Sequence, residues 1–192
     1  MNPNSGPGSS ANHDYLQVID YCHAVGHRVI GYVHTSYGTR PLATVKAEVD
    51  AYYGFYPTID GIFVDEMSNE PSTVAYYESV YAHAHTRAGT QDVVGNPGAA
   101  AVTEWQLQTP VVDELVVFEG TASSYLSWTP PQWVFGYVAS MIANLIFAAS
   151  DEDTVRRVRS HSREVNAGYL YVTHGTTPNP WATFAAGAPA RG

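Results

Sequence analysis

Acidic side chains stand at the ends of two apolar, β-branched runs of the sequence. Asp65 and Glu66 end the run at residues 62–64, and Glu119 ends the run at residues 115–118. Two carboxylates can hydrolyse a glycosidic bond, because one protonates the leaving oxygen while the other attacks or stabilises the oxocarbenium-like carbon. The pattern therefore makes Asp65, Glu66 and Glu119 candidate catalytic residues.

Other polar or aromatic side chains follow apolar runs in the same way: His34, Tyr37, Asn96 and His174. In a parallel barrel the C-terminal ends of the strands share one rim, and barrel enzymes assemble their sites there. Tyr125 and Trp128 lie in residues 120–128, which we interpret as a loop, and their rings could stack on sugars. Packing in the core is an equally good explanation for these two rings.

A structural explanation competes with the catalytic one for Asp65 and Glu66. An acidic residue at a strand end can cap the following helix by accepting backbone N–H groups. This explanation is weaker for Glu119, because the segment that follows it has the composition of a loop. The sequence alone leaves both explanations open.

Metal ligands are not indicated by the spacing of the histidines. His83 and His85 fall inside a helical pattern, where residues two apart project to different faces. His34 and His174 could join Asp65 or Glu119 around a divalent ion, as in barrel metallohydrolases. Apart from these, metal-ligand spacing is absent, and we expect neither a metal nor a cofactor.

Short apolar runs alternate with helical segments along the chain, which is typical of parallel β/α units. Strands are predicted at residues 28–35, 60–66, 92–96, 114–119, 143–149 and 168–173. Helices are predicted at residues 13–25, 41–53, 71–88, 100–109, 133–141 and 151–166. Strands with continuous apolar runs imply burial on both faces, as in a barrel or a doubly wound sheet.

Six predicted strands fall short of the eight that close a (β/α)8 barrel. No glycine-rich phosphate loop follows any of them, which argues against a nucleotide-binding doubly wound fold. The turn-rich residues 1–8 resemble a loop that leaves a strand. We therefore expect an α/β fold, a (β/α)8 TIM-type barrel lacking its first strand and part of its second, with residues 1–192 forming one domain.

The charge composition of the chain argues against two classes of binding partner. The 192 residues contain 9 Lys and Arg against 18 Asp and Glu, a net charge of −9, which opposes binding to nucleic acid or to an anionic membrane surface. Cys22 is the single cysteine, so the sequence indicates no internal disulfide. There is no apolar run of membrane-spanning length and no basic segment of signal-peptide type, so a cytoplasmic chain is one expectation. Oligomeric state is not indicated.

Five motifs resemble those of a known family: NPNSGPG at 2–8, GYVHTSYG at 31–38, DGIFVDE at 60–66, GNPG at 95–98 and VFE at 117–119. Their order is similar to that of spherulation-specific family 4, the spherulin-4-like proteins, placed in glycoside hydrolase family 135. The resemblance runs from Asn2 to about Trp181.

This resemblance implies a (β/α)8 barrel that hydrolyses α-1,4 linkages of N-acetylgalactosamine or galactosamine in an exopolysaccharide such as galactosaminogalactan. It implies catalytic roles for Asp65, Glu66 and Glu119. We expect substrate contacts from Asn4, His34, Tyr37, Asn96, Tyr125, Trp128 and His174. Members of the family often carry a secretion signal, which implies export of a longer form.

Two alternatives remain open. One is a non-catalytic protein that binds carbohydrate or serves a structural, spore-coat-like role. The other is a metal-dependent barrel hydrolase that uses His34 and His174.

Overall fold

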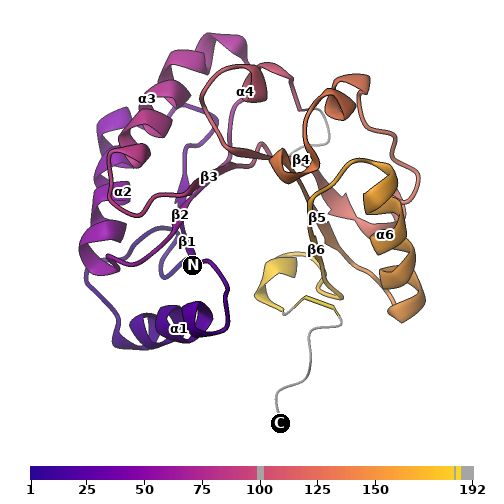
Figure 1. Ribbon diagram of the computed structural model, residues 1–192, viewed down its shortest axis with the longest axis horizontal. Helices are drawn as coiled ribbons and strands as arrows, with labels where there is room; N and C mark the ends of the chain where they lie inside the picture. The colour runs from indigo at the N-terminus through magenta and orange to yellow at the C-terminus, as the bar shows by residue number, and fades with distance from the viewer. Residues whose placement is uncertain (99–101, 184, 187–192) are drawn as a thin grey trace. The chain divides into compact units, whose positions relative to one another are not determined.

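The structure is a computed structural model that describes residues 1–98, 102–183 and 185–186 (Figure 1). Contacts between residues divide the chain into two compact units. Unit 1 comprises Met1–Pro97 and Trp105–Leu115, and unit 2 comprises Gly98–Glu104 and Val116–Gly192. The expectation of a single domain stays a prediction.

Six strands are found among the described residues, and each lies where the sequence predicts one. They are β1 (Ile30–His34), β2 (Gly61–Asp65), β3 (Asp92–Gly95), β4 (Glu114–Thr121), β5 (Ile142–Phe147) and β6 (Tyr169–Val172). Their order in the sheet is the order of the sequence. β1 with β2, β2 with β3, β3 with β4 and β5 with β6 all pair in parallel. The α/β class with a parallel sheet is therefore confirmed.

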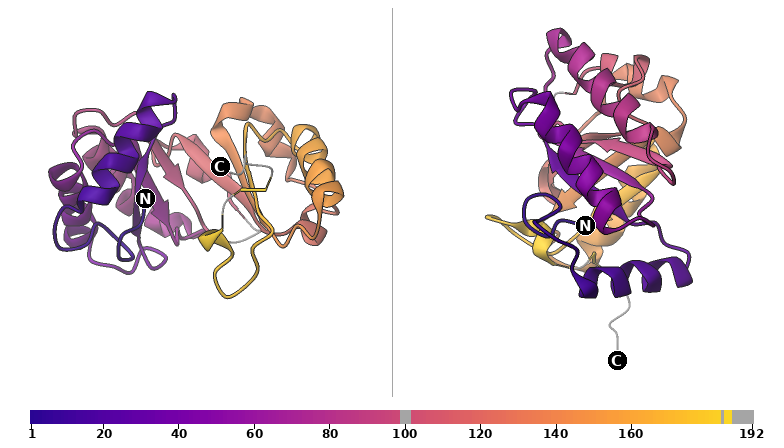
Figure 2. Two further views of the ribbon diagram at one scale, coloured as in Figure 1. Left: turned by 90° about the horizontal axis from the view of Figure 1, so that it is seen from below. Right: turned by 90° about the vertical axis from the view of Figure 1, so that its left-hand side faces the viewer.

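Unit 1 contains the first three strands and the start of β4. Its helices are α1 (His13–Ala24), α2 (Leu42–Phe55), the 3-10 helix η1 (Pro71–Thr73), α3 (Val74–His85) and α4 (Trp105–Gln108). α2 and α3 run side by side along one face of β1 to β3 (Figures 1 and 2). Apolar side chains on that face pack against the helices. The opposite face of these strands carries different side chains.

The two faces of these strands differ in sequence as well as in burial. Val33 and Val64 are register partners on the helix-covered face and are fully buried. Tyr32 and Phe63 are the preceding partners, so they point to the opposite face, where their rings stack with centroids 6.2 Å apart. Asp65 is two residues beyond Phe63 and shares its face, because side chains on a strand alternate.

Unit 2 contains most of β4, together with β5 and β6. Its helical elements are α5 (Ala122–Tyr125), η2 (Gln132–Gly136), η3 (Ala139–Met141), α6 (Glu152–Glu164) and η4 (Pro180–Ala182), of which the η elements are 3-10 helices. Asp151 begins α6 by accepting the backbone N–H of Thr154 at 2.7 Å. Phe118, Tyr125, Ile146 and Val158 belong to the buried cluster that joins α5 and α6 to the strands.

Three sequence-based predictions need correction. The helix predicted at residues 133–141 is wrong: two 3-10 helices lie there, separated by the extended residues Tyr137 and Val138, and Gly136 ends the first of them. The loop predicted at residues 120–128 is also wrong, because β4 continues to Thr121 and this residue caps α5. Only Trp105–Gln108 of the helix predicted at 100–109 is helical among the described residues, and residues 99–101 lie outside them.

No helix formed by residues 1–98, 102–183 and 185–186 is both long enough and apolar enough to cross a membrane.

Candidate active site

Asp65 is the best-defined polar group at the strand ends of unit 1. Its Oδ2 accepts a hydrogen bond from the hydroxyl of Tyr32 at 2.8 Å, and its Oδ1 accepts one from Nδ2 of Asn96 at 2.9 Å. The parallel register explains the geometry. Tyr32 lies on β1, two residues before His34, the register partner of Asp65, and therefore on the same face of the sheet as Asp65. Asn96 directly follows the last residue of β3. Both carboxylate oxygens are thereby held in a fixed orientation.

Both donors remain donors near neutral pH. Burial, together with the hydrogen bond to Asp65, raises the pKa of Tyr32 well above its ordinary value, so its hydroxyl stays protonated. The amide of Asn96 does not titrate. Asn96 is only 4% exposed, so we reassign it from the predicted substrate contact to a residue that positions Asp65.

Glu66 brings a second carboxylate to the same edge of unit 1. β2 ends at Asp65, and Glu66 has a left-handed backbone with φ of +52°. Successive strand residues point to opposite faces, but this turn lets the Glu66 side chain return toward β1. Its Oε2 lies 3.3 Å from Nδ1 of His34, with side chains 40% and 29% exposed respectively. Both ring and carboxylate can therefore reach solvent and a ligand.

Three non-glycine residues near this edge share the left-handed conformation. They are Ser36, Tyr37 and Glu66, with φ of +46°, +57° and +52°. The backbone N–H of Tyr37 donates to the carbonyl of Glu66 at 2.7 Å, which joins the two loops. Such conformations cost on the order of 1–3 kcal/mol each and cluster at functional sites. This strain singles out the ends of β1 and β2.

The hydroxyl of Tyr77, on α3, links the loop after β1 to the loop after β2 through hydrogen bonds. This group is 3.0 Å from Oγ1 of Thr35 and accepts the N–H of Ser68 at 2.7 Å. Oγ1 of Thr35 in turn lies 2.7 Å from the carbonyl oxygen of Glu66, to which it donates. Tyr77 is 1% exposed, so it acts as a support and cannot touch a ligand. Neither Tyr32 nor Tyr77 was predicted as a site residue.

We expect Tyr77→Phe to lower the free energy of unfolding by about 1–2 kcal/mol, because the buried N–H of Ser68 loses its acceptor. Thermal or urea unfolding would measure the change. Tyr76→Phe is the matched control, because the hydroxyl of Tyr76 is buried without a hydrogen-bond partner among the described residues. An equal loss for both variants would contradict the role given to the Tyr77 hydroxyl.

The other predicted residues of unit 1 lie on loops around this edge. Tyr37 is 58% exposed, so its ring is open to a ligand. Asn4 is exposed and lines a cavity of about 320 Å³ together with Glu48. Glu48 pairs with Arg40, whose Nη1 also donates to the carbonyl of His34 at 2.6 Å. Their substrate contacts stay predictions.

In unit 2, one predicted substrate contact is wrong. Tyr125 is 0% exposed and packs in the core, and its hydroxyl accepts a hydrogen bond from Nδ2 of Asn144 at 2.7 Å. Trp128 is partly buried against the same cluster, as the core explanation expects. Glu119 lies in β4, is partly exposed and does not cap a helix, since Thr121 caps α5. The role of Glu119 stays a prediction.

The helix-cap explanation for Asp65 and Glu66 is wrong, because η1 has Glu70 at its N-cap and no side-chain cap. The two histidines of the metal alternative each have their own partners. His34 faces Glu66, whereas Nδ1 of His174 lies 2.5 Å from the carbonyl oxygen of Ala149. Within the part of the chain that the structure describes, no three His, Cys, Asp or Glu side chains are grouped as a metal site would need.

Comparison with known sequences identifies the family. The sequence profile of spherulation-specific family 4 matches residues 1–189. The chain belongs to spherulation-specific family 4. Among the family's known proteins, Spherulin-4 of Physarum polycephalum is 38% identical over 133 residues, which are 67% of this chain and 39% of that protein. This member of spherulation-specific family 4 thus matches about two fifths of the length of that relative.

Comparison with solved structures supports the fold. The crystal structure of Aspergillus clavatus Sph3 in complex with GalNAc superposes with a TM-score of 0.76 at 24% sequence identity. The match covers 96% of this chain and 79% of that chain. This member of spherulation-specific family 4 therefore has the fold of Sph3, as the prediction of a TIM-type α/β fold requires.

Proposed function

We propose that this chain is a glycoside hydrolase that cleaves α-1,4-linked N-acetylgalactosamine or galactosamine in a polysaccharide. The observation that carries the proposal is the carboxylate of Asp65, held at a strand end by Tyr32 and Asn96. Glycosidases need a carboxylate in a fixed place beside the anomeric carbon. The GalNAc bound by Sph3, a protein of the same fold, supports the choice of sugar.

Asp65 is assigned the role of nucleophile or charge stabiliser. Its two hydrogen-bond donors fix the direction of its oxygens, which limits the rearrangement needed to reach the transition state. Glu66 is assigned to sugar positioning, because its carboxylate is exposed and its ion-pair partner, His34, is itself partly exposed. Glu119 is assigned the role of general acid and then base, on the family resemblance, in a retaining mechanism.

The proposal is tested by measuring reducing ends released from an α-1,4-linked galactosamine polymer. An α-1,4-glucan of similar length serves as control, because it has the same linkage without the amino group. Release from the amino-sugar polymer alone is the expected result. Binding of the polymer without any release would instead favour a carbohydrate-binding structural protein.

Turnover is expected to survive chelation. The strand-end groups of unit 1 are carboxylates held by tyrosine, asparagine and histidine side chains, and their proposed chemistry needs no Lewis acid. The measurement compares initial rates before and after incubation with EDTA. Loss of activity on chelation and its recovery with zinc would support the metal-dependent alternative.

A further inference from the structure

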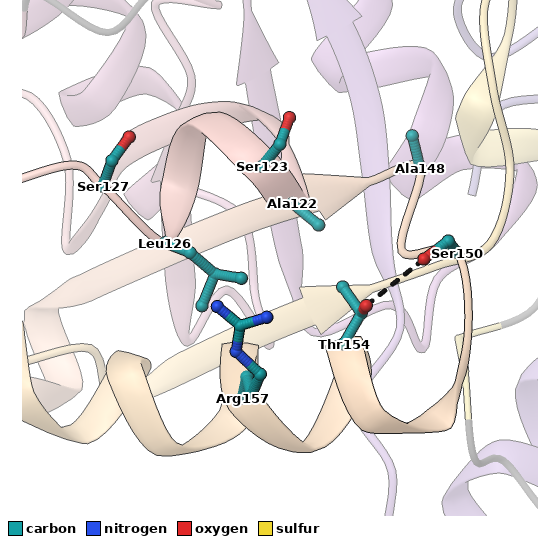
Figure 3. Close-up of a pocket in the computed structure, with 8 residues that line it drawn as sticks. All are labelled: Ala122, Ser123, Leu126, Ser127, Ala148, Ser150, Thr154 and Arg157. Carbon is teal, nitrogen blue, oxygen red and sulfur yellow. Dashed lines mark hydrogen bonds between the residues drawn. The ribbon is translucent and has the colours of Figure 1, made fainter.

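A second cavity lies in unit 2, between α5, the end of β5 and the first turns of α6 (Figure 3). Its volume is about 550 Å³, within the usual range for small-molecule pockets. Its lining residues are Ala122, Ser123, Leu126, Ser127, Ala148, Ser150, Thr154 and Arg157. Four hydroxyl groups and one cation thus surround a small apolar floor, and no carboxylate is among the described lining residues.

Arg157 is the distinctive group of this cavity. Its side chain extends from α6 toward Leu126, the residue that follows α5 (Figure 3). No hydrogen bond or ion pair engages its guanidinium among the described residues. A guanidinium offers five N–H donors in a planar fork that matches a carboxylate. Arg157 is exposed at the edge of the cavity, so its guanidinium can reach an anion that enters from solvent.

The nearby acidic residues of α6 are engaged elsewhere. Asp151 caps the helix by accepting the N–H of Thr154 at 2.7 Å, and Asp153 forms an ion pair with Arg156. Glu152 lies 3.5 Å from Nε2 of His174. None of these three carboxylates pairs with Arg157, so within the described part of the chain its guanidinium is left to an external anion.

The hydroxyl groups point to a ligand that carries hydroxyls of its own. Ser127 donates to the carbonyl of Ser124, and the hydroxyls of Ser150 and Thr154 lie 3.2 Å apart (Figure 3). Each hydroxyl retains acceptor capacity, since it has two lone pairs. Ala148 lines the cavity with a left-handed backbone, φ +53°, a conformation that marks functional sites.

We propose that this cavity binds an acidic sugar unit, with the carboxylate of the sugar on Arg157 and its hydroxyls on the serine and threonine side chains. The cavity is larger than an inorganic oxoanion requires, and its apolar floor of Ala122, Leu126 and Ala148 suits the C–H groups of a sugar ring. This site is separate from Asp65 and does not depend on hydrolysis there. It would give the chain a site for an acidic sugar in addition to the amino-sugar site proposed at Asp65.

The test uses the full chain at low ionic strength, with methyl α-galacturonide, methyl α-galactoside and inorganic phosphate as separate probes. Binding is measured by calorimetry and located by amide chemical shifts of residues 122–127 and 148–157. The galacturonide should bind at least about tenfold more tightly than the neutral galactoside, because a charge-assisted pair is lost with the latter. Added salt should weaken its binding.

Arg157→Gln should weaken galacturonide binding by about tenfold or more, since the bidentate donor is removed. Arg156→Gln is the matched control at the preceding position of α6, because Arg156 is exposed and paired with Asp153. It should leave binding within about twofold. Equal binding of the two sugars, an unaffected Arg157→Gln, or binding of phosphate without galacturonide would each overturn the proposal.

Discussion

Asp65→Asn is expected to reduce turnover of the amino-sugar polymer by about three orders of magnitude or more, as for the removal of a reacting carboxylate in other enzymes. The amide has the same shape but is a poor nucleophile and cannot stabilise a positive charge. The new amide can accept a hydrogen bond from Tyr32 or Asn96 through its oxygen and donate one to the other through its NH2 group. Initial rates at saturating polymer measure the loss, and unfolding curves should show a well-folded variant.

Asp92→Asn is the matched control for this variant. Asp92 is also an aspartate of unit 1, but it begins β3, at the opposite end of the strand from Asn96, and it pairs with Arg28. Its removal should leave turnover within about twofold, because a partly exposed ion pair contributes little. If Asp65→Asn retained the activity of the wild type, Glu66 would become the first alternative for the reacting carboxylate.

Glu119→Gln is expected to produce the second large loss, of about two to four orders of magnitude on the polymer, because general acid catalysis contributes on this scale. The loss should depend on the leaving group. An aryl glycoside with a nitrophenol leaving group needs little protonation, so its rate should fall far less. The measurement is the ratio of the two substrates' rates, compared between the variant and the wild type.

Glu164→Gln provides the control for Glu119, since Glu164 is an exposed glutamate at the end of α6 and is 3.5 Å from His161. It should change neither rate. A Glu119→Gln variant that loses the polymer and the aryl glycoside equally would contradict the role of general acid and would point to a role in binding.

The strands were predictable from the sequence because each is a compact apolar run. Residues 62–64 and 115–118 are buried on the helix side or on both sides, and such positions need apolar side chains whatever the rest of the chain does. The segment at residues 133–141 failed for the opposite reason. Its apolar residues have the spacing of an amphipathic helix, but Gly136 and the extended residues Tyr137 and Val138 interrupt the segment. Helix propensity is a weak predictor, and tertiary packing can override it.

The site was predictable only in part. Asp65 and Glu66 stand at a strand end, which the sequence reveals directly. Tyr32 holds Asp65 through the register between two strands, and Tyr77 reaches the loops from a helix, so both roles depend on contacts between distant segments. A signal for Tyr32 did exist, since it lies two residues before His34 and therefore on the same face.

The aromatic residues were the least predictable part. Tyr125 and Tyr37 both sit in segments that resemble loops, yet the first is fully buried beneath α6 and the second is exposed. A tyrosine suits either place, because its ring is apolar and its hydroxyl needs only one partner. For Tyr125 that partner is Asn144, a residue of β5 that no sequence pattern linked to it.

The most direct measurement is the anomeric configuration of the first sugar released from an α-1,4-linked galactosamine oligosaccharide, followed by proton NMR before mutarotation. If Asp65 is the nucleophile of a retaining glycosidase, the α-anomer appears first and the β-anomer accumulates only slowly. The β-anomer as first product, or the absence of any released sugar, would contradict the account.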